Sequence, residues 1–206
     1  MKKNSGKHIH LVSKYFYALS RQSLSFMGAK IEVQGRENIP SEACVFVSNH
    51  QGIMDVFLLV YELQKSVGFI AKKEVVNIPV VRYWLVGGKG IYLNREDARQ
   101  GMLTIMDGVK NLEEGYSMAV FPEGTRSRCP EMGEFKKGAL KLATKAKVAV
   151  VPVSISGSYK LFDAPQRDKR VKVIIHAPME TENLTKQEER CLSDRVFQVI
   201  KAGLQQ

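Results

Sequence analysis

Short apolar runs alternate along this chain with longer segments in which apolar residues recur every three or four positions. The short runs are rich in β-branched residues, which is typical of buried strands, and the longer segments have helical periodicity. Strands are predicted at 43–47, 67–71, 91–93, 118–121, 148–153 and 171–176, and helices at 54–64, 79–86, 96–113 and 137–146. This alternation predicts an α/β fold with a largely parallel mixed sheet flanked by helices.

The segment 8–27 is predicted to form an amphipathic helix ahead of the first of these strands. Its apolar residues follow the spacing of one helix face: Val12, Tyr15, Phe16 and Leu19. Lys14 and Arg21 lie off that face. A basic amphipathic helix either lies in a membrane interface or packs on its own domain, and the periodicity alone favours neither.

The C-terminal segment carries a helix start signal, because Thr185 is followed three residues later by Glu188. A closing helix of about 18 residues is therefore predicted. With 206 residues, of which 44% are hydrophobic, the chain is long enough to bury one full core. We expect a single domain, with residues 1–29 as the N-terminal helix and 30–206 as the α/β core.

The cysteine content argues against a metal or disulfide scaffold. The chain has three cysteines and no Cys-x-x-Cys pair: Cys44, Cys129 and Cys191. Reduced, buried thiols are therefore expected. His8 and His10 have no third ligand nearby in the sequence, so no metal site is predicted. His176 lies among apolar strand residues, which favours a structural histidine.

The net charge of +10 points to an anionic partner, either nucleic acid, an acidic membrane or a phosphorylated metabolite. The chain lacks zinc-finger spacing and RNA-recognition aromatic motifs, so a nucleic-acid-binding domain is disfavoured. It also lacks a signal peptide and an apolar run of about 20 residues. We therefore expect a protein that is neither secreted nor membrane-spanning.

The most informative polar cluster follows the predicted strand 43–47 and contains His50 and Asp55. A turn at Gly52 allows the Asp55 carboxylate to return to the imidazole of His50. Such a carboxylate fixes the tautomer of the ring and leaves the other ring nitrogen available as a base. The spacing alone is equally compatible with a structural histidine near an aspartate at the start of a helix.

Two further clusters follow predicted strands. The first is the turn 121–127, in which Gly124, Thr125 and Arg126 offer backbone, hydroxyl and guanidinium donors suited to a phosphate or carboxylate. The second runs from Gly87 to Arg95, where Arg95 is placed at the carboxyl end of a strand. Taken singly, the turn 121–127 is also compatible with a polar surface turn, and Arg95 with a solvent-exposed charge. Ligands of such folds bind beyond the carboxyl ends of the strands, where both clusters are expected.

Together these clusters resemble the motif blocks of the 1-acyl-sn-glycerol-3-phosphate acyltransferase family of glycerolipid acyltransferases. The resemblance runs from about residue 30 to 180. It rests on the order and spacing of His50-x4-Asp55, the strand with Arg95, Phe121-Pro122-Glu123-Gly124-Thr125-Arg126-Ser127, and Val151-Pro152-Val153. One departure is Lys89, which stands in a glycine-rich stretch where the family often has glycine.

The resemblance implies that His50 is the general base and Asp55 its orienting partner. A glycerol hydroxyl would attack an acyl thioester carried by coenzyme A or by acyl-carrier protein, with no other cofactor. The positions that would bind the glycerol phosphate are Arg95, Glu123, Gly124, Thr125 and Arg126, with Lys72 and Lys137 as secondary candidates. The lipid substrate implies that the N-terminal helix binds an anionic membrane surface, on the cytoplasmic face of the cell membrane.

Two neighbouring chemistries were weighed against this interpretation. A serine hydrolase is disfavoured because the chain has no Gly-x-Ser-x-Gly motif. A thioesterase would use His50 with water but would not require the phosphate-binding turn. Within the resemblance, glycerol-3-phosphate, another lysophospholipid or an acyl amino-acid lipid remain alternative acceptors.

Overall fold

The computed structural model describes residues 2–72, 79–93, 98–136, 138–162 and 168–206. Seven strands form one sheet in the order β1-β7-β6-β2-β5-β3-β4. They are β1 (Lys30–Gln34), β2 (Val45–Ser48), β3 (Val67–Lys72), β4 (Ile91–Leu93), β5 (Ser117–Val120), β6 (Val150–Ser156) and β7 (Arg170–Ile175). All neighbours pair in parallel except β6 and β7, so the predicted largely parallel mixed sheet is correct.

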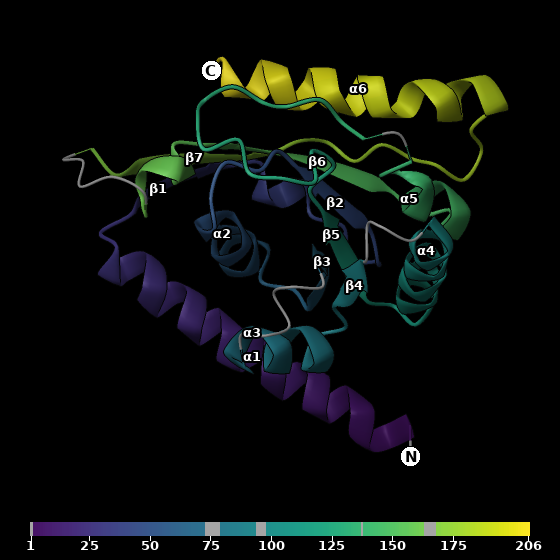
Figure 1. Cartoon of the computed structure of the whole chain (residues 1–206), viewed down its shortest axis with the longest axis horizontal. Helices are drawn as coiled ribbons and strands as arrows, with labels where there is room; N and C mark the ends of the chain where they lie inside the picture. The colour runs from purple at the N-terminus through teal and green to yellow at the C-terminus, as the bar shows by residue number, and fades with distance from the viewer. Residues whose placement is uncertain (1, 73–78, 94–97, 137, 163–167) are drawn as a thin grey trace.

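Helices cover both faces of this sheet (Figure 1). On one face lie α1 (Lys2–Phe26), α2 (Met54–Leu63) and α3 (Pro79–Gly87), and toward the other lie α4 (Ala98–Glu113), α5 (Lys141–Ala146) and α6 (Lys186–Leu204). Two short 3₁₀ helices complete the fold, η1 (Arg36–Asn38) and η3 (Ser158–Lys160). The alternating residues of β2 show the two layers, because Phe46 faces the core that contains α1 and α2 whereas Val45 and Val47 face the core that contains α6.

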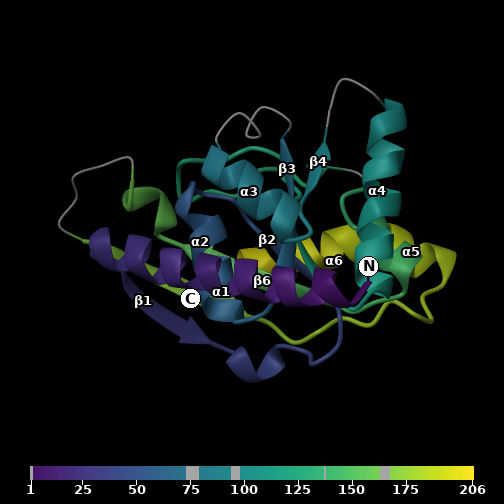
Figure 2. The ribbon, with the colours of Figure 1, turned by 90° about the horizontal axis from the view of Figure 1, so that it is seen from below.

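The N-terminal helix packs on the domain through part of the face that the sequence predicts, because Tyr15 of that face is 55% exposed. Val12 and Phe16 are buried against α2 and α3, whereas Leu11 and Tyr15 are exposed. Both views of the molecule show α3 beside α1 (Figures 1 and 2). Within the described residues, no helix combines the length and apolar content that a transmembrane span requires.

The structure differs from the sequence-based expectation in three places. Strand β1 was not predicted, and its pattern of half-buried and exposed residues reflects a position at the sheet edge beside β7. The Lys-rich helix predicted at 137–146 begins only at Lys141, after a turn at 138–140. Of the three cysteines only Cys44 is buried, because Cys129 lies in a partly exposed loop and Cys191 on the outer face of α6. All three are free thiols, as expected.

Candidate active site

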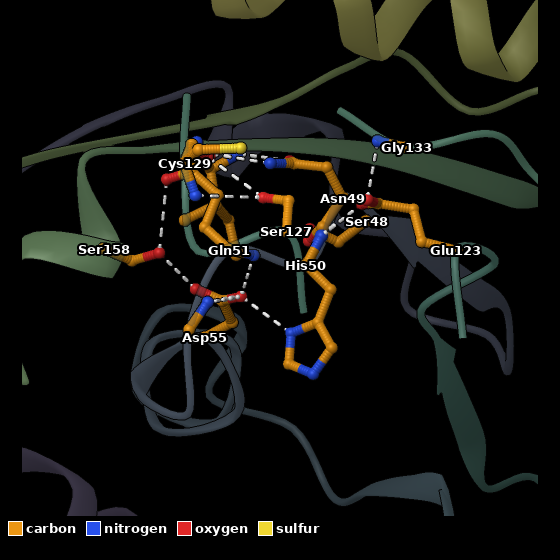
Figure 3. Close-up of polar contacts among 12 residues, drawn as sticks. Ser48, Asn49, His50, Gln51, Asp55, Glu123, Ser127, Cys129, Gly133 and Ser158 are labelled. Atoms are coloured by element: carbon orange, nitrogen blue, oxygen red, sulfur yellow. Dashed lines mark hydrogen bonds and ion pairs between the residues drawn. The ribbon is translucent and has the colours of Figure 1, made fainter. Parts of the chain in front are cut away.

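The order of the sheet brings three separate segments together at one edge. Strand β2 lies between β5 and β6, and all three run parallel. Their carboxyl ends therefore meet at the same edge, where ligand sites of open parallel sheets occur. The segment after β2 carries His50 and Asp55, the segment after β5 carries Glu123, and the segment after β6 carries Ser158. Figure 3 shows these side chains converging.

The Asp55 carboxylate contacts the His50 imidazole as the sequence predicts. Oδ2 of Asp55 lies 2.8 Å from Nδ1 of His50, and it also accepts hydrogen bonds from the backbone N–H groups of Gln51 (2.6 Å) and Gly52 (2.9 Å). Asp55 is fully buried in the first turn of α2, where the helix dipole favours a negative charge. Oδ2 of Asp55 accepts in each of these contacts, which fits a His50 ring that donates from Nδ1.

The second ring nitrogen of His50 remains available. Figure 3 shows it pointing away from the labelled polar groups, and within the described part of the chain Nε2 has no hydrogen-bond partner. The side chain of His50 is 17% exposed, so the ring is partly accessible from outside the core. An imidazole that donates from Nδ1 and exposes Nε2 is the form that can accept a proton from a substrate.

Aromatic packing also positions the imidazole. The ring of Phe121, at the end of β5, stacks on His50 with centroids 4.0 Å apart and planes 18° from parallel. Phe121 in turn stacks with Phe69, which contacts Trp84 of α3, and Trp84 stacks on Phe16 of α1. A continuous row of rings therefore joins the imidazole to the N-terminal helix, so His50 is supported by the same core that holds α1.

The loop after β5 is held against the His50 segment by its backbone. Ser127 N–H donates to the His50 carbonyl (2.8 Å), and Arg128 N–H donates to the Gln51 carbonyl (3.1 Å). Arg128 adopts a left-handed conformation with φ of 57° to make this turn. The predicted phosphate-binding turn therefore lies directly beside His50.

Glu123 is buried, and both of its carboxylate oxygens bind backbone. Oε1 accepts from the N–H of His50 (2.7 Å) and Oε2 from the N–H of Gly133 (2.7 Å). Burial raises the pKa of this carboxyl above its ordinary value, and the two N–H donors oppose that rise. Glu123 thus connects its own loop to the backbone of His50 and to the loop at Gly133. That it also binds substrate stays a prediction.

Of the remaining predicted binding residues, those that the structure describes lie at or near the same edge. Thr125 and Arg126 are exposed in the turn after β5, and the N–H of Gly124 donates to the Phe121 carbonyl (3.0 Å) within that turn. Lys72 is exposed at the carboxyl end of β3. Arg95 and Lys137 fall outside the described residues. Among the described residues, no group of three histidine, cysteine or acidic side chains is arranged to hold a metal ion.

Two residues at the site were not assigned a role from the sequence. Phe121 belongs to a predicted motif with no role of its own, and Ser158 lies outside every predicted cluster. A signal for Ser158 does exist, because Gly157-Ser158 follows a buried strand at the edge where ligands of parallel sheets bind.

The sequence model of the acyltransferase family matches residues 30–156, which include the His50–Asp55 pair and the turn after β5. The chain belongs to the acyltransferase family. The chloroplastic 1-acyl-sn-glycerol-3-phosphate acyltransferase of Arabidopsis thaliana is 36% identical over 180 residues, covering 84% of this chain and 49% of that protein. The corresponding Borreliella burgdorferi enzyme is 34% identical over 141 residues, covering 68% of this chain and 56% of that protein.

A solved structure of the same family has the same fold. The crystal structure of the 1-acyl-sn-glycerophosphate acyltransferase from Thermotoga maritima superposes with a TM-score of 0.81 and 31% sequence identity. The match covers 96% of this chain and 80% of that one. The chain spans about half the length of the first curated relatives it matches. The acyltransferase fold that the motifs predicted is therefore present.

Proposed function

We propose that this protein transfers an acyl chain from an acyl thioester to the free hydroxyl of 1-acyl-sn-glycerol-3-phosphate, forming phosphatidate for phospholipid synthesis. The observation that carries the proposal is the His50–Asp55 pair, with its open Nε2, beside the turn that holds Thr125 and Arg126. The relatives named 1-acyl-sn-glycerol-3-phosphate acyltransferases support the choice of acceptor.

In this mechanism Nε2 of His50 removes the proton of the substrate hydroxyl as its oxygen attacks the thioester carbonyl carbon. The carbon–oxygen bond forms, and the imidazolium is stabilised by the ionised Asp55 at Nδ1. When the tetrahedral intermediate collapses, the carbon–sulfur bond breaks and the sulfur takes the proton from Nε2. The products are the ester and a free thiol of coenzyme A or of acyl-carrier protein.

The acceptor's phosphate provides the specificity in this proposal. A dianionic phosphate is bound best by charge-assisted donors, each contributing roughly 1.5–3 kcal/mol. Arg126 and Thr125 supply a guanidinium and a hydroxyl at the turn beside His50, and Arg95 and Lys72 follow neighbouring strands. Glu123 stabilises the same turn by accepting hydrogen bonds from the backbone N–H groups of His50 and Gly133. The alternative acceptors are glycerol-3-phosphate, another lysophospholipid and an acyl amino-acid lipid.

We also propose that the outer face of α1 and α3 rests on an anionic membrane. Leu11 and Tyr15 on α1 are 64% and 55% exposed, and Tyr83 and Val86 on the adjacent α3 are 53% and 65% exposed. Exposed basic residues accompany them: Lys7, Lys14 and Arg82. Exposed apolar side chains among basic ones are typical of helices that lie in a membrane interface.

The membrane proposal is tested by flotation with vesicles of phosphatidylglycerol or of phosphatidylcholine alone. We expect binding to the anionic vesicles, weakened by the double variant Leu11→Ser, Tyr15→Ser. The matched control is Met102→Ser, Met106→Ser, which changes two exposed methionines on α4, a helix that Figure 1 shows apart from α1. Equal binding by both double variants and the wild type would contradict the assignment to this face.

The acyl-transfer proposal is tested with purified protein and a panel of labelled lyso-acceptors, each supplied with acyl-CoA or acyl-carrier protein thioester. Phosphatidate is the expected product, and free fatty acid alone would indicate a thioesterase instead. Arg126→Ala should raise the KM for the acceptor by roughly tenfold or more, as expected for a lost charge-assisted hydrogen bond. Arg190→Ala removes an exposed arginine on α6 and should leave that KM unchanged.

A further inference from the structure

Ser158 reaches the site through a sharp turn that only glycine permits. Strand β6 ends at Ser156, and Gly157 follows with a φ of 86°. A Cβ at Gly157 would lie 2.4 Å from the carbonyl oxygen of Arg170, so any other residue would collide with that backbone. The turn leads into η3, which contacts α2, and leaves Ser158 1% exposed.

The hydroxyl of Ser158 contacts the carboxylate oxygen of Asp55 that faces away from the imidazole. It donates to Oδ1, whereas Oδ2 accepts from His50 and from the backbone of Gln51 and Gly52. The side-chain oxygen of Gln51 is a second acceptor, 3.4 Å away. A serine hydroxyl has one proton, and the charged, nearer carboxylate oxygen takes it. Figure 3 shows Ser158 and His50 on opposite sides of Asp55.

We propose that Ser158 is a positioning residue of the catalytic pair, acting on His50 through Asp55; this inference rests on the proposed function. It holds the carboxylate plane so that Oδ2 stays directed at Nδ1. It also draws negative charge toward Oδ1, which sets how strongly Asp55 stabilises the imidazolium. Without the hydroxyl, Oδ1 is a buried carboxylate oxygen that has lost a strong donor.

This role predicts a direction for the pH dependence of the reaction. Two carboxylates interact with His50 in the described part of the chain, Asp55 from α2 and Glu123 from the loop after β5. Loss of the Ser158 hydrogen bond concentrates the charge of Asp55 on the oxygen facing His50. The protonated ring of His50 is then favoured up to a higher pH. The low-pH side of the kcat/KM profile (its acid limb), where protonation of the base lowers the rate, therefore moves to higher pH.

The test compares Ser158→Ala with Ser154→Ala in the acyl-transfer assay across pH. Ser154 is the matched control, because it is also a buried β6-segment serine, but its hydroxyl bonds to Ile200 and His176 on the α6 side. We expect Ser158→Ala to lower kcat roughly tenfold, as for a lost hydrogen bond to a charged group, with little change in the KM of either substrate. Its acid limb moves to higher pH, whereas Ser154→Ala lowers the melting temperature and leaves kcat and the pH profile unchanged.

A third variant, Ser158→Cys, keeps the space filled and retains only a weak donor. Its kcat and acid limb are expected between those of the wild type and Ser158→Ala, and it carries the test if the alanine variant does not fold. An unchanged pH profile in both Ser158 variants, or an equal change in Ser154→Ala, overturns the inference. Failure of the proposed function has a different signature: wild-type protein without acyl transfer, or His50→Ala with normal activity.

Discussion

His50 and His176 both come at the end of a strand, yet they lie on opposite faces of the sheet: His50 contacts Asp55 of α2, and His176 lies on the α6 side. His50 follows β2, which runs parallel to its neighbours, whereas His176 follows β7, which is antiparallel to β6. Each ring has one hydrogen-bonded nitrogen, 2.8 Å from Asp55 in one case and 2.8 Å from the Ser154 hydroxyl in the other. The face of the sheet therefore separates the two rings: His176 pairs with Pro152 in the middle of β6 and packs under α6, whereas His50 lies beyond the end of β2, beside α2.

The partners of the two rings differ in charge, and that decides what each ring can do. The ionised Asp55 stabilises an imidazolium at His50. The Ser154 hydroxyl donates to the Ile200 carbonyl, so it accepts from Nε2 of His176 and offers no charge. Burial lowers the pKa of His176 below its ordinary value. His176 is thus a neutral structural histidine, as its apolar surroundings in the sequence predicted.

The largest expected effect separates these two histidines in the acyl-transfer assay. His50→Ala removes the proposed base and should lower turnover about 10²–10⁴-fold, the usual contribution of general base catalysis. His176→Ala removes a ring on the opposite face of the sheet and should leave turnover essentially unchanged. Initial rates at saturating substrate, with circular dichroism to verify folding, measure both. A similar loss in the two variants would mean that the contrast between them is wrong.

A smaller effect, on stability alone, is expected at the Ser154–His176 pair. A Cβ at Gly203 would lie 2.3 Å from Ser154 Oγ and 2.8 Å from His176 Nε2. Gly203→Ala should therefore push α6 away from the sheet and lower the free energy of unfolding by roughly 1–3 kcal/mol, typical of overpacking. Urea denaturation measures this change, and the KM values should not move because the His50–Asp55 pair lies on the other face of the sheet.

Gly101 provides the control for that substitution. It lies within α4, and a Cβ there would meet nothing within 4 Å. Gly101→Ala should raise the free energy of unfolding by up to about 1 kcal/mol, because alanine is the better helix former. If Gly101→Ala and Gly203→Ala destabilised the protein to the same extent, the close approach of α6 to the sheet at Gly203 would not be the cause of the destabilisation.

The sequence predicts most of the elements here because their signals are local. Strand β4 has the predicted bounds, and the closing helix starts at Thr185 with both hydrogen bonds of the capping box present. Strand β1 was missed because only Ile31 and Val33 in it are apolar, and its partner β7 lies 140 residues further along the chain. The reversed direction of β7 has no local signal either.

In the site, too, contacts between residues close in sequence were predictable and contacts between distant segments were not. The contact of Asp55 with His50 spans five residues, so spacing and a turn at Gly52 were enough to predict it. The contacts of Glu123 and Ser158 span 73 and 103 residues, and they depend on β2 lying between β5 and β6. A strand order is set by packing of the whole sheet, so local periodicity could not place these two side chains.

The smallest expected effect concerns the pH dependence of stability. Because burial lowers the pKa of His176 from its ordinary value of 6.5, the folded protein disfavours the protonated ring more than the unfolded chain does. The stabilisation from keeping this ring neutral is fully present above the pKa of the ring in the unfolded chain and is lost as the pH falls below it.

His176→Gln keeps a hydrogen-bonding group for Ser154 but does not titrate. Urea denaturation at pH 7, 6 and 5 should therefore show the wild type losing stability relative to His176→Gln as the pH falls, by less than the change in Gly203→Ala. Parallel stability curves for the two proteins would show that the His176 ring is not kept neutral by burial, and the contrast with His50 would then rest on the hydrogen-bond partners of the two rings alone.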